Sequence, residues 1–225
     1  MFSIIIINYN TAELTSACLE SIFKYCEGSK YEIILIDNNS EEKEIDILER
    51  RYVSRVKIIR NKRNFGFARA NNQGAKLARG EYLFFLNSDT TIEQNILEPL
   101  REKLEAEKKI GIIAPKLVLK NGYEQPYAFG LHKNSDIISW VSGAALVIRR
   151  EIFLQIGGWE ERFFMYFEDV DLCRQVIKRG YRVERLLVTE VTHLVGGSPV
   201  HFWRRKLFYY YSKILFIFKH YLKLL

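Results

Sequence analysis

The feature that most constrains the fold is a series of short, predominantly apolar runs that alternate with helical patterns. Four runs of strand length occupy residues 3–7, 32–36, 56–59 and 82–86. Helical periodicity separates them at residues 14–26, 42–50 and 68–78. Strands that are apolar throughout must be covered on both faces. The alternation therefore predicts an α/β fold with a mostly parallel, Rossmann-like central sheet and helices on both faces.

The second half of the chain is less regular. Further strands are predicted at residues 110–119, 140–148 and 181–188, and a helix at residues 168–179. The second of these strands contains the run Gly143-Ala144-Ala145. Small side chains inside a strand indicate close approach of a ligand or of another backbone segment.

Polar segments follow each of the first four predicted strands. They are residues 8–11 (NYNT), 37–40 (DNNS), 61–66 (NKRNFG) and 87–90 (NSDT). The carboxyl ends of parallel strands meet at one edge of a sheet, and ligands bind there. One such segment is an ordinary turn, but four together predict a binding site.

Two aspartates in these segments are candidate ligands. Asp37 directly follows a strand, where a carboxylate accepts hydrogen bonds from a ribose or base, although a turn role is the simpler interpretation of Asp37 alone. Asp89 stands at the sheet rim, where a divalent ion bridging two phosphates needs an oxygen ligand. His193 becomes a further candidate ligand only if it meets Asp89 in space.

An acidic triplet opens the predicted helix at residues 168–179. Glu168, Asp169 and Asp171 would stabilise its first turn through the helix dipole, which is one explanation for them. The preceding residues 162–167 (RFFMYF) form an aromatic stretch suited to holding a sugar ring. A helix N-terminus also keeps a carboxylate ionised, as a general base requires.

Charge is concentrated at one end of the chain. The net charge is +7, and the segment after Glu190 contains six basic residues and no acid. Nucleic-acid binders usually spread basic residues over the folded body, so nucleic acid is not an expected partner. Residues 201–225 are predicted to form a basic, aromatic, amphipathic helix. It either packs on protein, including a second copy, or lies on an anionic membrane surface.

Cysteine usage and hydropathy point to the cytoplasm. Cys18, Cys26 and Cys173 form no CxxC pair and are expected to be reduced, buried thiols. No basic segment precedes the first apolar run, so no signal peptide is expected, and no apolar stretch reaches the roughly 20 residues that span a bilayer. The expected location is cytoplasmic, in peripheral contact with the inner face of the cell membrane through residues 201–225.

These segments together resemble the inverting family 2 glycosyltransferases of the GT-A fold group, especially their rhamnosyltransferase-like branch. The blocks that match, in order, are residues 3–10 (SIIIINYN), 34–40 (ILIDNNS), 64–72 (NFGFARANN) with 86–89 (LNSD), and 157–172 (GGWEERFFMYFEDVDL). His193 and residues 196–198 (GGS) complete the pattern. The resemblance implies a GT-A domain over residues 1–200, followed by the helix at 201–225.

The resemblance also implies roles for individual residues. The implied nucleotide-binding residues are Tyr9, Asn10, Asp37, Asn64, Gly66, Asn72, Asn87, Ser88 and Asp89. Asp89 and His193 would hold Mg²⁺ or Mn²⁺, Asp169 would be the general base, and Glu168 would stand beside it. Asn87 departs from the family pattern, which has an acid there, and Gly158-Trp159-Glu160 stands where Gly-Phe-Asp is usual.

The implied donor is a dTDP-, UDP- or GDP-sugar, with dTDP-rhamnose first. The implied acceptor is a hydroxyl of a glycan or of a lipid-linked molecule in cell-surface polysaccharide synthesis. A nucleotidyltransferase that makes sugar nucleotides is a rival, but it needs a Gly-rich, basic loop after the first strand, which residues 8–11 are not. A non-catalytic nucleotide-sugar-binding subunit of a polysaccharide assembly complex is the other alternative.

Overall fold

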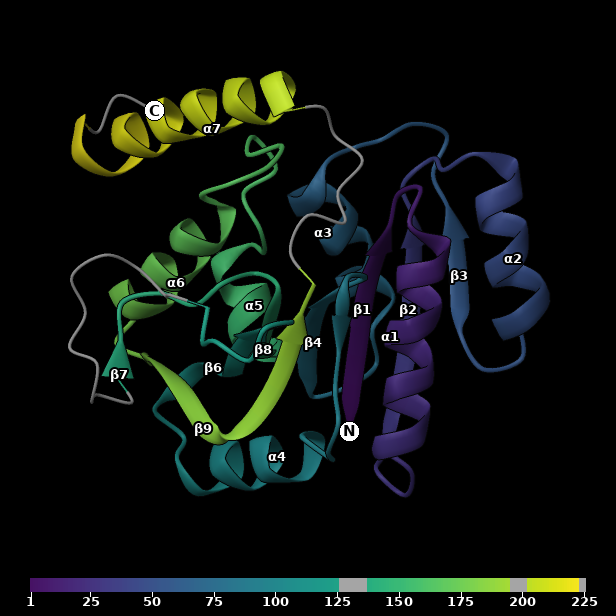
Figure 1. Ribbon diagram of the computed structural model, residues 1–225. Coiled ribbons are helices and arrows are strands. Elements are labelled where there is room, and N and C mark those ends of the chain that lie inside the picture. Colours follow the sequence, from purple (N-terminus) through teal and green to yellow (C-terminus); the bar gives the residue numbers. More distant parts are fainter. Residues whose placement is uncertain (126–136, 195–201, 223–225) are drawn as a thin grey trace.

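A computed structural model describes residues 1–125, 137–194 and 202–222, which form a single nine-stranded sheet flanked by helices (Figure 1). The strands are β1 (Phe2–Asn8), β2 (Tyr31–Asp37), β3 (Lys57–Arg60), β4 (Tyr82–Asn87), β5 (Thr90–Thr91), β6 (Ile110–Leu119), β7 (Ile137–Ile138), β8 (Ala145–Arg149) and β9 (Arg182–His193). The helices are α1 (Ala12–Tyr25), α2 (Glu42–Tyr52), α3 (Phe67–Leu77), α4 (Leu97–Ala106), α5 (Arg150–Ile156), α6 (Glu168–Lys178) and α7 (Phe202–Ile217), and a π-helical turn (Phe218–Leu222) follows α7.

The sheet has the order β3-β2-β1-β4-β8-β6-β9-β5, and β7 pairs with β9. β1, β2, β3 and β4 form a parallel block, and β6 and β9 are also parallel to each other. β8 runs antiparallel between β4 and β6 and joins the two halves. The α/β fold with a mostly parallel central sheet is therefore confirmed.

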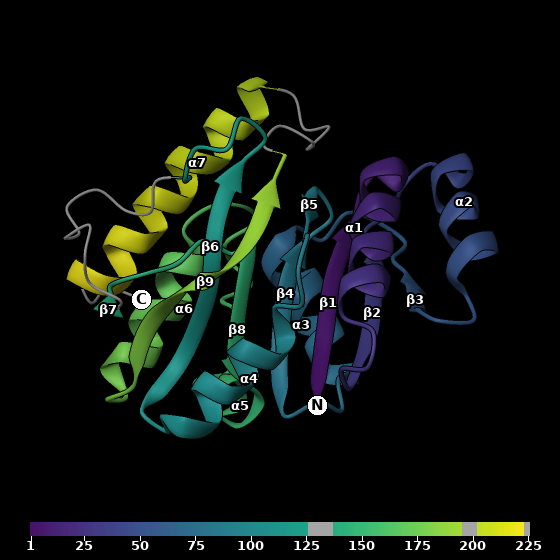
Figure 2. The same ribbon diagram turned by 60° about the horizontal axis from the view of Figure 1, so that its bottom comes forward.

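Helices cover both faces of the sheet, as predicted (Figures 1 and 2). Ile4 and Ile6 of β1 contribute to a buried cluster that also contains side chains of α1, α2 and α4. Ile5, between them, contributes to a second cluster with side chains of α3, α5 and α6. Successive side chains of a strand point to opposite faces, so both faces must be apolar when both are covered.

Some predicted boundaries were wrong. The strand predicted at 140–148 begins only at Ala145, because residues 142–144 leave the sheet and the Gly143 N–H donates to Asp169 Oδ2 at 3.0 Å. β9 continues beyond residue 188 and ends at His193, which pairs with Thr90 of β5. Helices α4 and α5 were not predicted.

The predicted C-terminal helix is confirmed over the residues that the structure describes. α7 and its π-helical turn lie at the end of the molecule opposite the N-terminus (Figure 1). Within residues 1–125, 137–194 and 202–222, no helix is both long and apolar enough to cross a membrane.

Candidate functional site

The polar segments that follow the first strands are tied together at one edge of the sheet. Asn8 Nδ2 donates to Asp37 Oδ1 at 2.8 Å and so joins the ends of β1 and β2. The hydroxyls of Thr11 and Ser88 lie 3.2 Å apart and connect the loops after β1 and β4. Much of the Asn- and Asp-rich character of these segments therefore serves to fix the loops on one another.

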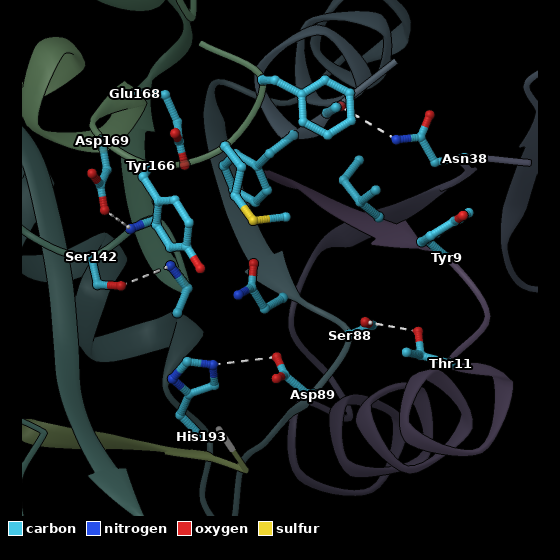
Figure 3. A pocket seen from close by; sticks show the side chains of 18 of the residues that line it. Tyr9, Thr11, Asn38, Ser88, Asp89, Ser142, Tyr166, Glu168, Asp169 and His193 are labelled. Atoms are coloured by element: carbon cyan, nitrogen blue, oxygen red, sulfur yellow. Dashed lines mark hydrogen bonds and ion pairs between the residues drawn. The ribbon is translucent and has the colours of Figure 1, made fainter. Parts of the chain in front are cut away.

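A cavity of about 390 Å³ opens at this edge (Figure 3). Its lining includes most of the predicted site residues, namely Tyr9, Asn64, Gly66, Asn87, Ser88, Asp89, Glu168, Asp169 and His193. Side chains from the parallel half of the sheet thus face side chains from β9 and α6 across one pocket.

Asp89 and His193 meet on one wall of the cavity, although they are far apart in the sequence. Asp89 Oδ1 and His193 Nε2 are 3.3 Å apart (Figure 3). His193 Nδ1 lies 2.7 Å from Gln125 Oε1, so Nδ1 donates its hydrogen to Gln125. In a neutral imidazole Nε2 then carries the lone pair and faces Asp89 and the cavity, and this is the tautomer that a metal ligand requires.

Gln125 also lines the cavity, and the sequence analysis missed it. The chain reverses after β6 at Asn121-Gly122, and the Gln125 N–H then donates to the Leu117 carbonyl at 2.9 Å. Asn-Gly is a strong signal for a hairpin turn, so the return of the chain beside β6 was foreseeable. The register of the returning chain, which brings Gln125 to His193, was not foreseeable from the sequence.

The donor set fits a hard or borderline divalent ion such as Mg²⁺ or Mn²⁺. One carboxylate and one imidazole nitrogen supply two ligands, and such ions complete their shell with water and substrate phosphates. No group of three His, Cys, Asp or Glu side chains within metal-binding reach occurs among the described residues.

Glu168 and Asp169 lie on the other wall, at the start of α6. Asp169 is held from both sides, because its Oδ2 accepts the Gly143 N–H at 3.0 Å and its Oδ1 accepts the Val170 N–H at 2.8 Å. Glu168 is only 7% exposed, and its Oε2 has no hydrogen-bond partner among the described residues. The pair thus consists of one carboxylate fixed by the backbone and one left for a ligand.

Burial raises the pKa of both carboxyl groups. The pKa of Asp169 rises by desolvation, partly offset by the two backbone N–H donors. The pKa of Glu168 is raised well above its ordinary value, first by burial and then by the negative charge of Asp169. The arrangement favours an ionised Asp169 beside a protonated Glu168, which can donate a hydrogen bond into the cavity.

The aromatic segment of residues 163–167 forms a further part of the wall, and its backbone is strained. Tyr166 and Phe167 have φ values of 72° and 66°, in the left-handed region that non-glycine residues rarely adopt. Gly66, at a φ of 83°, lets this segment approach α3, since a Cβ there would lie 2.7 Å from the Phe164 carbonyl oxygen. Tyr166 thereby lies in the cavity (Figure 3).

Three predicted nucleotide-binding residues do not line the cavity. Asp37 is 2% exposed and accepts hydrogen bonds from Asn8 and from the Ser40 N–H, so it fixes loops. Asn10 accepts the Glu41 N–H at 2.7 Å. Asn72 exchanges hydrogen bonds with the backbone of Trp159 at 2.9 Å in both directions. Their assignment to the nucleotide stays a prediction, and the predicted residues 196–198 lie outside the described residues.

The sequence profile of glycosyl transferase family 2 matches residues 3–157. This match covers more than half of the chain, and the cavity lies where such a fold binds its ligand. The chain belongs to glycosyltransferase family 2.

Curated relatives agree with this assignment. An O-antigen biosynthesis protein of Myxococcus xanthus, RfbC, is 25% identical over 222 residues, 87% of this chain and 17% of that protein. An uncharacterised glycosyltransferase of Haemophilus influenzae is 30% identical over 70% of this chain and 56% of its own length. An N-acetylglucosaminyl-diphospho-decaprenol L-rhamnosyltransferase of Mycobacterium tuberculosis is 45% identical over 56 residues, 25% of this chain and 18% of that protein. The chain thus spans little more than half, or much less, of these relatives.

Solved structures share the fold. GalNAc-T7, solved with UDP, GalNAc and Mn²⁺, aligns with a TM-score of 0.74 at 20% identity over 86% of this chain and 44% of that one. Staphylococcus aureus TarS 1–349 in complex with UDP aligns with a TM-score of 0.73 at 21% identity over 86% of this chain and 60% of that one. The fold is that of the GT-A glycosyltransferases.

Proposed function

We propose that this chain is an inverting, metal-dependent glycosyltransferase of the rhamnosyltransferase-like branch. It moves a sugar, with rhamnose as first candidate, from a dTDP-, UDP- or GDP-linked donor to a hydroxyl of a glycan or lipid-linked acceptor in cell-surface polysaccharide synthesis. The observation that carries the proposal is the pairing of two chemistries in one cavity: Asp89 with His193 on one wall, and Asp169 with Glu168 on the other.

Each wall has its own task in this reaction. Asp169 takes the proton of the acceptor hydroxyl as the hydroxyl oxygen bonds to the anomeric carbon. The bond from that carbon to the diphosphate oxygen breaks, and its electron pair leaves with the diphosphate. Because attack and departure occur on opposite faces, the configuration inverts through an oxocarbenium-like transition state. A divalent ion held by Asp89 and His193 would neutralise the charge of the leaving diphosphate.

Other features support the finer parts of the proposal. Tyr9, Asn64 and Gly66 line the donor side of the cavity, and the aromatic segment at residues 163–167 offers a flat apolar surface for a sugar. Asn10, Asp37 and Asn72 would act indirectly, by holding the loops that bind the nucleotide. The rhamnosyltransferase relative supports the choice of donor, and the basic, aromatic C-terminal helix supports a place in the cytoplasm at the inner face of the cell membrane.

A thermal-shift panel tests the proposal. The chain is heated with dTDP-, UDP- and GDP-sugars, each with and without Mg²⁺ or Mn²⁺. A ligand at about 100 times its Kd stabilises a native protein by about 2.7 kcal/mol, which for a chain of this size raises the Tm by roughly 5–10 °C. We expect such a shift for one nucleotide class, and only with metal.

Matched variants make the result specific. Asp89→Ala should abolish the metal-dependent shift, whereas Glu93→Ala, which removes an exposed acid outside the cavity, should leave it intact. Absence of a shift with every nucleotide, with and without metal, would refute the proposal. A full shift in Asp89→Ala would refute the assignment of the metal ligand.

A further inference from the structure

The side of α7 that faces away from the domain carries an apolar and aromatic stripe. Trp203, Leu207, Tyr210 and Ile214 follow one another at alternating spacings of four and three residues, which places them on one side of a helix. Their exposed fractions are 68%, 68%, 60% and 55%. Contiguous apolar surface of this kind marks a face that is covered by a partner.

The opposite side of α7 already has its partners within the chain. Ser212 is fully buried, and its hydroxyl donates to the Met165 carbonyl at 2.8 Å. Phe208 stacks on Phe164 with ring centroids 4.5 Å apart, and Phe216 packs with Phe163 in a small buried cluster. The outward stripe is therefore not the surface through which α7 packs on its own domain.

Three contacts of the π-helical turn fix the direction in which the stripe points. The Asp171 carboxylate of α6 contacts both Lys219 Nζ at 3.0 Å and His220 Nε2 at 2.6 Å. Lys219 also contacts Glu160 at 3.0 Å. The end of the helix is thereby anchored to the domain, and the outward face is held as a fixed surface.

The borders of the stripe are basic. Arg204, Lys206 and Lys213 are exposed beside it, and the chain has no acid after Glu190. Against a second copy of itself, α7 would bring basic residues together with no acid of its own to pair with them. Against anionic headgroups, the same residues are complementary, and Trp and Tyr are the aromatic residues favoured at a lipid–water interface.

We propose that the outward face of α7 docks on an anionic membrane surface. The inner face of the same helix packs on Phe164 and Met165, which line the cavity, and a helix with its side chains is about 10–12 Å across. The docked bilayer would therefore lie one helix diameter from the cavity wall. This position favours a lipid-linked molecule as the acceptor of the site. The inference about the acceptor rests on the proposed function.

Vesicle co-sedimentation with the full chain tests the docking surface. Vesicles of phosphatidylcholine alone are compared with vesicles that also contain phosphatidylglycerol, at low and at high salt. We expect binding to the anionic vesicles that weakens as salt rises. Each basic residue near an anionic surface contributes roughly a fivefold gain in binding, so the double variant Arg204→Gln/Lys213→Gln should bind about 30-fold more weakly.

Matched variants separate the stripe from the rest of the surface. Leu207→Glu/Ile214→Glu should abolish sedimentation with anionic vesicles. Val53→Glu/Leu154→Glu makes the same change at side chains that are 72% and 55% exposed elsewhere, and it should bind normally. Lys57→Gln/Lys108→Gln removes two exposed charges outside α7 and should also bind normally.

Three results would overturn the proposal. The first is equal loss of binding in the control variants, and the second is equal binding to vesicles without anionic lipid. The third is absence of vesicle binding together with a dimer that Leu207→Glu/Ile214→Glu dissociates, which would assign the stripe to a second copy. The nucleotide-dependent thermal shift of the stripe variant is measured in parallel, so failure of docking and failure of the transferase proposal remain distinguishable.

Discussion

Replacing Asp169 by Asn removes the charge of the proposed base while keeping its shape. An amide cannot accept the proton of the acceptor hydroxyl, and a positioned general base contributes about 10²- to 10⁴-fold to a rate. We expect the transfer rate to fall by this factor. Binding of the nucleotide, on the opposite wall with Asp89 and His193, should survive.

The substitution also has a structural cost that can be worked from the contacts. Asp169 uses both oxygens, one for the Gly143 N–H and one for the Val170 N–H. Asn offers one acceptor oxygen and turns an NH₂ group toward the other donor, so one backbone N–H loses its partner. A buried donor left unpaired costs about 1–3 kcal/mol, which urea unfolding should register as a lower free energy of unfolding.

Glu168→Gln is the matched control. Within the part of the chain that the structure describes, the Glu168 Oε2 has no hydrogen-bond partner, and burial together with the charge of Asp169 raises the pKa of Glu168. The glutamine therefore resembles the neutral acid that it replaces, and we expect a smaller loss of rate and no loss of stability. Transfer rates of donor sugar to acceptor, measured at saturating donor, compare the two variants.

The pH dependence gives an independent check. A base works only when ionised, and burial raises the pKa of Asp169, so the rate should fall as pH is lowered through that raised pKa. Glu168→Gln should keep this acid limb, whereas Asp169→Asn should lose it. Loss of nucleotide binding in step with transfer in Asp169→Asn, or a Glu168→Gln variant as inactive as Asp169→Asn, would refute the assignment of the base.

Two further predictions concern the supports of the site. Gln125→Leu removes the acceptor that orients His193, so metal affinity measured in the presence of nucleotide should fall roughly 10- to 100-fold, and an unchanged affinity would contradict this role. Gly66→Ala and Gly28→Ala both introduce a side chain at a φ near 84°, and this backbone strain costs about 1–2 kcal/mol in each variant. Of these two sites, only Gly66 places the new Cβ against another residue, at the Phe164 backbone. Urea unfolding should show Gly66→Ala as the less stable variant. Equal losses in the free energy of unfolding would show that the aromatic segment shifts away from the new Cβ without cost.

The parallel half of the fold was predicted well from the sequence, because the apolar composition of each strand there agrees with its burial in the structure. Runs such as residues 3–7 are apolar on both faces, and both faces are covered by helices. Prediction failed at residues 140–144, where strand-like composition yields to the hydrogen bond between Gly143 and Asp169. Local patterns could place Asp89 and His193 on separate elements. Their contact depends on the pairing of β5 with β9, which no local pattern specifies.

The two walls of the site differ in what supports them. The wall that carries Asp89 is built on loops that bond to one another directly after β1, β2 and β4. On the wall that carries Asp169, helix α6 begins directly after Tyr166 and Phe167, which have left-handed backbone conformations. Such strain persists only where the surrounding structure enforces it. Here α7 provides that structure, through Ser212 on the Met165 carbonyl and through the contacts of the following turn with Asp171, two residues from Asp169. The helix that we assign to the membrane is thus also the one that supports the strained backbone before the proposed base, so membrane attachment and this wall of the site share one structural element.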